Sequence, residues 1–272
     1  MIALVVEVDP VDVEIAADAL WSLGVVAVEE RAGHDGRIEL WTSLGDDVEA
    51  IAVALAALPV SWPHRFVEVD DRVVDTWREF ATPTWIADDL VVCPAWVDAT
   101  FAPHVEVIEI EPGATFGMGD HPTTVLSLQA VSAVIGAGGV QSVLDVGCGS
   151  GVLAIAALRL GATSAVAVDI SPAAAVATVD NARRNGVVGR IDASTTPLSS
   201  VTGSYDLVLA NILAPALVEL APHLRRVLAP GGTLVVSGIL ADDHDHVLRA
   251  LTPLQVRSTR VLDGWAAISL QP

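Results

Sequence analysis

Hydrophobic and polar positions follow two different patterns along this chain. Over the first 70 residues, short runs typical of strands are separated by two stretches with apolar residues at helical spacing. We expect strands at 2–8, 25–30, 37–44 and 65–69, and helices at 11–23 and 46–58. The order β-α-β-β-α-β is that of a ferredoxin-like split unit. The pattern therefore predicts a small α+β ferredoxin-like domain over residues 1–70, followed by a charged connector over residues 71–100.

From Pro122 onward, apolar runs alternate regularly with amphipathic helical stretches. This alternation predicts a mostly parallel sheet with helices on both faces, a Rossmann-like doubly wound α/β domain that we place at residues 101–272. The dipeptide Asp263-Gly264 predicts an antiparallel hairpin between the last two strands. We expect its strands at 142–146, 164–168, 190–195, 206–210, 231–237, 254–261 and 265–270, its helices at 122–135, 150–160, 172–185, 215–228 and 241–251, and two further strands beside it at 86–94 and 104–110.

A glycine-rich segment joins the first strand of this domain to the next helix. It reads Asp145-Val-Gly147-Cys-Gly149-Ser-Gly151, and Asp169 follows the next strand, 22 residues after Gly147. The glycines let the backbone approach a ligand closely, and the following helix offers N–H groups to an anion. An acid at the end of the second strand accepts hydrogen bonds from ribose hydroxyls. The combination predicts a nucleoside-bearing ligand.

The spacing of the glycines selects among such ligands. A dinucleotide fingerprint places its third glycine one residue later than Gly151, where this chain has Val152. The acidic start and the G-x-G-x-G spacing are similar to the S-adenosylmethionine loop of Rossmann-like methyltransferases. An ordinary strand-to-helix turn would explain the glycines alone, but it would not explain Asp169.

Two further segments carry candidate chemistry. Asn211 ends an apolar strand, where its amide can donate and accept hydrogen bonds, although capping of the helix that begins near Pro215 is the alternative. Residues 116–124 form a glycine-hinged loop that runs into a helix start. Within it, His121 is either an acid–base group or, as is more common before a proline, a turn or capping residue. Neither His-x-Glu nor Cys-x-x-Cys spacing occurs near these segments, so we expect no metal.

Composition narrows the class of protein. The mean hydropathy is +0.55, but the longest uncharged stretch, 122–144, is divided by glycines into a helix and a strand that are each too short to cross a bilayer. The N-terminus has no basic region and does not resemble a signal peptide. The two cysteines, Cys93 and Cys148, cannot form a disulfide framework. We expect a soluble cytoplasmic protein without membrane contact.

The charge is unevenly distributed. Residues 1–100 hold 20 acids and 5 arginines, a net charge of −15, whereas residues 101–272 have a net charge of −5. An acidic N-terminal region argues against a nucleic-acid partner there and suits a basic protein. A solvated acidic surface that aids solubility is the alternative.

Together the segments resemble the PrmA family, whose members methylate ribosomal protein L11 of the large ribosomal subunit. The segments that carry the resemblance lie between about residues 75 and 245 and are 92–96, 116–124, 145–151, 169–172, 180–186, 210–214, 220–222 and 237–240. The resemblance implies S-adenosylmethionine as cofactor and lysine side-chain or N-terminal amines of L11 as methyl acceptors. It also places the acidic N-terminal unit where the family keeps its substrate-recognition domain.

The resemblance implies specific site residues as well. It implies cofactor contacts at Thr124, Gly147, Asp169 and Asn211, to which we add Asp145, Gly149, Phe116 and Gly117. Asn211 is also our candidate catalytic residue, because its amide could orient the amine. Met118 and Asp120 stand where the family usually has threonine. We expect a monomer.

Rival functions remain open beside this one. The alternatives are methylation of lysines on another protein and, less favoured, methylation of a small molecule or a nucleic acid, or a binding module without catalysis. Methyltransferases that act on amino groups of bases usually have Asn-Pro-Pro-Tyr where this chain has Asn211-Ile-Leu, and the chain lacks a basic stripe.

Overall fold

The computed structural model describes residues 2–22, 28–42, 62–68, 81–111 and 119–272. The chain divides into two compact units, Met1–Ala81 and Thr82–Pro272.

The first unit contains a four-stranded antiparallel sheet. Its strands are β1 (Ile2–Val8), β2 (Val28–Ala32), β3 (Ile38–Thr42) and β4 (His64–Glu68), in the order β2-β3-β1-β4. Helix α1 (Val13–Ser22) buries Ala16 and Leu20 in one apolar cluster with alternate residues of β1. A short 3-10 turn at His34–Gly36 joins β2 to β3. All four predicted strands are confirmed, whereas the helix predicted at 46–58 lies outside the described residues.

The second unit begins earlier than the sequence pattern indicated. Strands β5 (Thr84–Ala87), β6 (Leu90–Pro94) and β7 (Glu106–Ile110) form a three-stranded sheet that belongs to this unit. The unit therefore starts at Thr82 and includes much of the connector that we predicted over residues 71–100. The physical reason is that every residue of β6 is buried, so this segment serves as core and not as a linker.

The main sheet of the second unit has seven strands, in the order β10-β9-β8-β11-β12-β14-β13. Neighbouring strands from β10 to β12 run parallel, and β14 is antiparallel to both β12 and β13. The predicted hairpin is confirmed, with Asp263 and Gly264 both at positive φ. The strand bounds are Ser142–Val146 (β8), Ser164–Val168 (β9), Ile191–Ser194 (β10), Tyr205–Asn211 (β11), Leu228–Leu240 (β12), Gln255–Leu262 (β13) and Trp265–Gln271 (β14).

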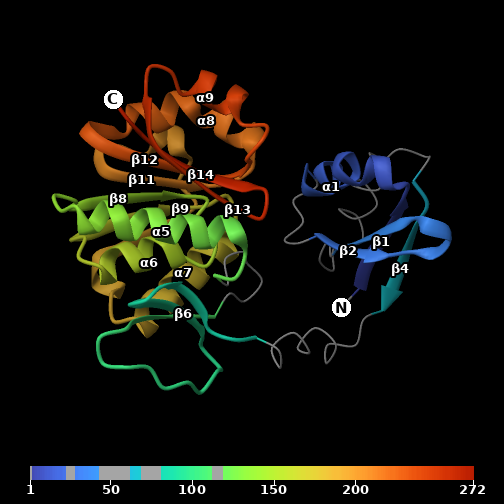
Figure 1. Ribbon diagram of the computed structural model, residues 1–272, viewed down its shortest axis with the longest axis horizontal. Coiled ribbons are helices and arrows are strands. Elements are labelled where there is room, and N and C mark those ends of the chain that lie inside the picture. The colour runs from blue at the N-terminus through green and yellow to red at the C-terminus, as the bar shows by residue number, and fades with distance from the viewer. Residues whose placement is uncertain (1, 23–27, 43–61, 69–80, 112–118) are drawn as a thin grey trace. The chain divides into compact units, whose positions relative to one another are not determined.

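Helices cover both faces of this sheet. Helices α5 (Pro122–Gly136), α6 (Val152–Arg159) and α7 (Pro172–Arg184) lie on one side, and α8 (Ala214–Arg226) and α9 (Asp245–Ala250) lie on the other (Figure 1). Alternate residues of the central strands enter the two apolar clusters: Leu207 packs on the side of α6, and Val208 packs on the side of α8. The doubly wound α/β fold is thus confirmed. Helix α9 begins later than predicted, because residues 240–243 form a turn before it.

No helix among the described residues is long and apolar enough to cross a membrane.

Candidate active site

The candidate site lies along the carboxyl edge of the main sheet, where the strand order reverses between β8 and β11. In the register of the sheet, Val146 of β8 stands beside Val168 of β9 and Ala210 of β11. The residues that follow these three are Gly147, Asp169 and Asn211. Ligands of doubly wound sheets bind at such a switch point. The structure therefore brings together three of the residues predicted from sequence.

The glycine loop is held by hydrogen bonds of its own backbone. The N–H groups of Gly147 and Cys148 donate to the carbonyl of Val168, at 2.8 and 3.2 Å, and that of Gly151 donates to the carbonyl of Cys148 at 2.7 Å. These three loop N–H groups therefore bind the chain's own backbone. Gly147 has φ 74°, and a Cβ there would lie 2.3 Å from Cγ2 of Ile212. Its lack of a side chain lets the loop pack closely against the segment after β11.

Asp169 closes the same loop through its carboxylate. Oδ2 accepts a hydrogen bond from the N–H of Gly149 at 2.9 Å, and Oδ1 accepts one from the N–H of Ser171 at 2.9 Å. A carboxylate oxygen has more than one lone-pair site, so each can accept a further bond from a ligand hydroxyl. Asp169 therefore shapes the glycine loop and keeps the capacity to accept further hydrogen bonds.

Asp145 lies beneath the loop and is fully buried. Its Oδ2 accepts a hydrogen bond from the N–H of Ala154 at 3.2 Å, whereas its Oδ1 has no partner in the described part of the chain. Burial raises the pKa of this carboxyl to about 7; the Ala154 N–H lowers it, and the charge of Asp169 raises it further. Its protonation therefore changes near neutral pH.

The first turn of α5 is tied to this same edge. Ser237 stands beside Asn211 in the sheet; its hydroxyl donates to the carbonyl of Ala266 at 2.9 Å, and its Oγ lies 3.4 Å from the carbonyl oxygen of Thr123. His121 caps the helix: its Nδ1 accepts a hydrogen bond from the N–H of Thr123 at 3.3 Å. Burial lowers the pKa of His121. The capping interpretation of His121 is confirmed.

The hydroxyl of Thr124 is the second buried polar atom at this edge that lacks a partner among the described residues, with Oδ1 of Asp145 the first. Burying a polar group without a partner costs about 1–3 kcal/mol, and each such group in a folded protein calls for an explanation. Two such atoms near one edge of the sheet fit a polar ligand bound there.

Asn211 is half-buried and is the last residue of β11. The N-cap of α8 is Leu213, so the capping alternative for Asn211 is wrong. Its side chain has no hydrogen-bond partner within the described ranges. As far as the described residues show, the Asn211 amide is therefore available for a ligand at the switch point.

Phe116 and Gly117, which we predicted as cofactor contacts, lie outside the described residues, as does Met118. Asp120 is described and exposed. In the ranges that the structure describes, no three His, Cys, Asp or Glu side chains are grouped to hold a metal ion.

Comparison with known proteins settles the family. The sequence profile of the family described as "Ribosomal protein L11 methyltransferase (PrmA)" matches residues 42–272. The chain belongs to this family. A ribosomal protein L11 methyltransferase of Geobacter sulfurreducens is 41% identical over 213 residues, covering 78% of this chain and 68% of that protein. One of Photorhabdus laumondii is 37% identical over 259 residues, covering 88% and 86%.

A solved structure agrees with this membership of the L11 methyltransferase family. The crystal structure of ribosomal protein L11 methylase from Lactobacillus delbrueckii subsp. bulgaricus has a TM-score of 0.65 and 33% identity, covering 70% of this chain and 98% of that one. This chain is accordingly a methyltransferase, and its cofactor is S-adenosylmethionine.

Sequence reasoning assigned no role to residues of α7, yet α7 supports the glycine loop of this methyltransferase. Thr178 donates from Oγ1 to the carbonyl of Gly149 at 3.2 Å, and Asn181 donates from Nδ2 to the carbonyl of Ser150 at 2.9 Å. Both side chains are fully buried. The segment 180–186 is one of those that resemble the family. Polar residues at helical spacing within this helix were the sequence feature from which the contact with the loop could have been predicted.

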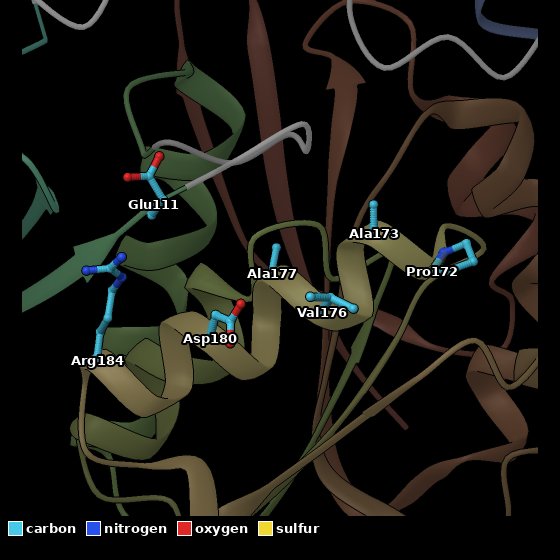
Figure 2. A pocket seen from close by; sticks show the side chains of 7 residues that line it. All are labelled: Glu111, Pro172, Ala173, Val176, Ala177, Asp180 and Arg184. Atoms are coloured by element: carbon cyan, nitrogen blue, oxygen red, sulfur yellow. The ribbon is translucent and has the colours of Figure 1, made fainter. Parts of the chain in front are cut away.

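The outer face of α7 borders a separate hollow of about 460 Å³. Figure 2 shows its lining, with Glu111 beside the helix and the α7 side chains in a row from Pro172 to Arg184. Val176, with 61% of its surface exposed, lies in the middle of that row. Helix α7 thus has a buried face that holds the glycine loop and an open face toward this hollow.

Proposed function

We propose that this chain transfers methyl groups from S-adenosylmethionine to amines of ribosomal protein L11, at lysine side chains, the N-terminus or both. The observation that carries the proposal is the row of Asp169, Gly147 and Asn211 at the switch point, in a chain that belongs to the L11 methyltransferase family. The test is to incubate the full-length chain with purified L11 and methyl-labelled cofactor. Label in L11 is expected. Cofactor binding without transfer to L11 would contradict the substrate and would favour another protein's lysines.

The cofactor-binding residues that we propose share the carboxyl edge of the sheet or the segments that lead to it. They are Thr124, Asp145, Gly147, Gly149, Asp169 and Asn211, with Phe116 and Gly117 from the sequence pattern. Asp169 would accept hydrogen bonds from the ribose hydroxyls. Replacing it with alanine should weaken binding by ~1.5–3 kcal/mol, because a bond to a charged group is lost. Calorimetry with the cofactor, and with NAD as the specificity control, measures this; unchanged affinity would mean that Asp169 is misassigned.

The reaction needs orientation and exclusion of water more than acid–base groups. When bound, S-adenosylmethionine supplies a methyl group activated by its sulfonium. The chain has to align the neutral amine with that methyl and keep water away. A desolvated crevice lowers the pKa of a lysine amine and so favours its neutral form. His121 is a poor candidate for a general base, because its Nδ1 accepts the capping bond from Thr123.

Asn211 would orient the amine, since its side-chain oxygen can accept an N–H bond. Asn211→Ala should then lower kcat by about 10²-fold, a loss typical of one positioned hydrogen-bonding group in an active site. The affinity for S-adenosylhomocysteine, measured by calorimetry, distinguishes the two possible roles. If affinity falls as much as kcat, Asn211 holds the cofactor and not the amine.

The first unit would recognise the substrate. Its antiparallel order β2-β3-β1-β4 with a packed helix supports a ferredoxin-like domain, and the net charge of −12 over residues 1–81, from 17 acids and 5 arginines, suits a basic protein. Because exposed charges are screened over ~10 Å at 0.1 M salt, methylation of L11 should weaken as salt rises. Removal of residues 1–81 should abolish methylation while cofactor binding persists. Full activity of the truncated chain would exclude the recognition role.

We further propose that the protein works in the cytoplasm as a monomer and binds neither membranes nor nucleic acid directly. A net charge of −20 disfavours contact with a phosphate backbone, and the proposed substrate is a ribosomal protein. Light scattering of the purified chain tests whether it is a monomer, and a gel-shift assay with ribosomal RNA tests whether it binds nucleic acid.

A further inference from the structure

We infer that Asn181 is a positioning residue for the cofactor: it fixes the glycine loop by tying the carbonyl of Ser150 to the end of β7. The inference rests on the assignment of the carboxyl-edge crevice as the cofactor site. It gives a role in that site to α7 and to the three-stranded sheet, neither of which contains a residue of the row at the switch point.

The side-chain amide of Asn181 makes three hydrogen bonds to backbone groups. Its Oδ1 accepts a hydrogen bond from the N–H of Glu111 at 2.9 Å, and its Nδ2 donates to the carbonyl of Glu111 and to that of Ser150, both at 2.9 Å. The side chain is fully buried. One amide thus satisfies three backbone groups from two distant segments, and a buried amide so engaged has little freedom to move.

Glu111 is the first residue after β7, and Figure 2 shows it beside α7, where its side chain lines the same hollow as Asp180 and Arg184. Asn181 pairs with its N–H and its carbonyl together, in the manner of a neighbouring strand. The end of β7 therefore serves as a fixed support, and the bond from Asn181 to Ser150 transmits that support to the glycine loop.

The carbonyls of two consecutive loop residues are held in this way. Thr178 binds the carbonyl of Gly149, and Asn181 binds that of Ser150. Because a peptide is planar and its carbonyl is opposite its N–H, fixing two carbonyls fixes the orientation of two peptide planes. Gly149 and Gly151 have positive φ, and glycine is also free to adopt other conformations. The contacts from α7 therefore restrict these glycines to the conformation that the structure shows.

The chain provides a matched control at the C-cap of α7, one turn after Asn181. Asn185 is also buried, and it makes the same pair of hydrogen bonds to the N–H and carbonyl of Glu109, at 2.9 and 2.7 Å. Its third bond goes to the carbonyl of Asn181 in its own helix, at 2.8 Å, and not to the loop. Replacing either asparagine with alanine removes three comparable hydrogen bonds, but only one of the two variants releases the glycine loop.

The experiment compares Asn181→Ala with Asn185→Ala in the full chain, using S-adenosylhomocysteine as the probe. Both variants should lose similar thermal stability. Calorimetry well below the unfolding transition should show a roughly two- to tenfold higher Kd for Asn181→Ala, the range that a net hydrogen bond of 0.5–1.5 kcal/mol gives. The Kd of Asn185→Ala should stay within about twofold of the parent. In turnover, the KM for S-adenosylmethionine should rise while kcat at saturation holds.

Equal Kd changes in the two variants, or no change in Asn181→Ala, would overturn the inference while leaving the proposed function intact. If the unaltered chain fails to bind the probe, the crevice itself is misassigned. Should Asn181→Ala not fold, Thr178→Val replaces it, because valine keeps the shape of the side chain and removes only the hydroxyl that holds Gly149. A higher Kd in Thr178→Val supports the role of α7, and an unchanged Kd contradicts it.

Discussion

Two aspartates at opposite edges of the main sheet, one partly exposed and one fully buried, have pKa values shifted in opposite directions. At the amino edge, Asp206 at the start of β11 accepts three hydrogen bonds at 2.9 Å with one carboxylate oxygen, from the N–H groups of Gln141 and Ser142 and from the Ser142 hydroxyl. These bonds hold the pKa of Asp206 below its usual range. At the carboxyl edge, Asp145 accepts one bond and its pKa is raised to about 7.

The difference agrees with the proposal that the carboxyl edge holds the cofactor while the amino edge contributes stability. Asp206 has its partners inside the protein and joins β8 to β11 through them. Asp145 and Thr124 each keep a buried polar atom without a partner in the described residues, which a fold shaped for stability alone would avoid. The carboxyl edge therefore carries a cost in stability that a bound cofactor would offset.

A glycine at each edge gives the sharpest test of this comparison. Gly147→Ala should reduce cofactor affinity more than 100-fold, because its Cβ would lie 2.3 Å from the Ile212 side chain and would displace the loop. Gly139→Ala at the amino edge is the control: Gly139 also has a positive φ, 89°, but a Cβ there meets nothing within 4 Å. Both variants have the strain of a left-handed alanine, about 1–2 kcal/mol. Calorimetry with S-adenosylhomocysteine should show a much lower affinity for Gly147→Ala than for Gly139→Ala. Similar affinities in the two variants would contradict the importance of the close packing of Gly147 against Ile212.

The free energy of unfolding should depend on pH in opposite ways at the two edges. The expected change in free energy is nearly as large as the loss of binding free energy in Gly147→Ala. The pKa of Asp145 is raised from 3.8 to about 7 on folding, so its stabilising contribution is complete below pH 3.8 and is lost as pH rises toward 7. Asp145→Asn removes this titration. Between pH 5 and pH 8 the variant should therefore gain about 2–3 kcal/mol relative to the parent. Denaturant unfolding of the cofactor-free protein at both pH values measures the gain, and parallel curves would show that Asp145 does not titrate in this range.

The sequence predicted the parts of this comparison that follow from local rules. Alternation of apolar runs with helices predicted a parallel sheet, and the rule that ligands bind at carboxyl ends placed Gly147, Asp169 and Asn211 together. Local rules could not show that Thr178 and Asn181 reach the loop, because those contacts join residues about 30 positions apart. Local rules also missed the close packing of Ile212 against Gly147, and they placed the buried strand β6 in a connector. Neither feature follows from the spacing of apolar residues within one segment.

The smallest expected effect is at Asp206, and it has the opposite sign with pH. Its pKa is lowered on folding, so its stabilising contribution is complete above pH 3.8, the ordinary value for aspartate, and is lost as pH falls below it. Asp206→Asn should cost about 1–2 kcal/mol at pH 7, because an amide oxygen is a weaker acceptor for the three donors than a carboxylate. That cost should shrink as pH falls toward 3, where the parent carboxylate also begins to take up a proton.

Cofactor affinity of Asp206→Asn should remain that of the parent, because Asp206 lies at the edge of the sheet away from the proposed cofactor site. Unfolding experiments at pH 3 and pH 7, with calorimetry at pH 7, test both points. A loss of affinity in Asp206→Asn would mean that the two edges are coupled and that support of the cofactor site extends through the whole length of β8 and β11.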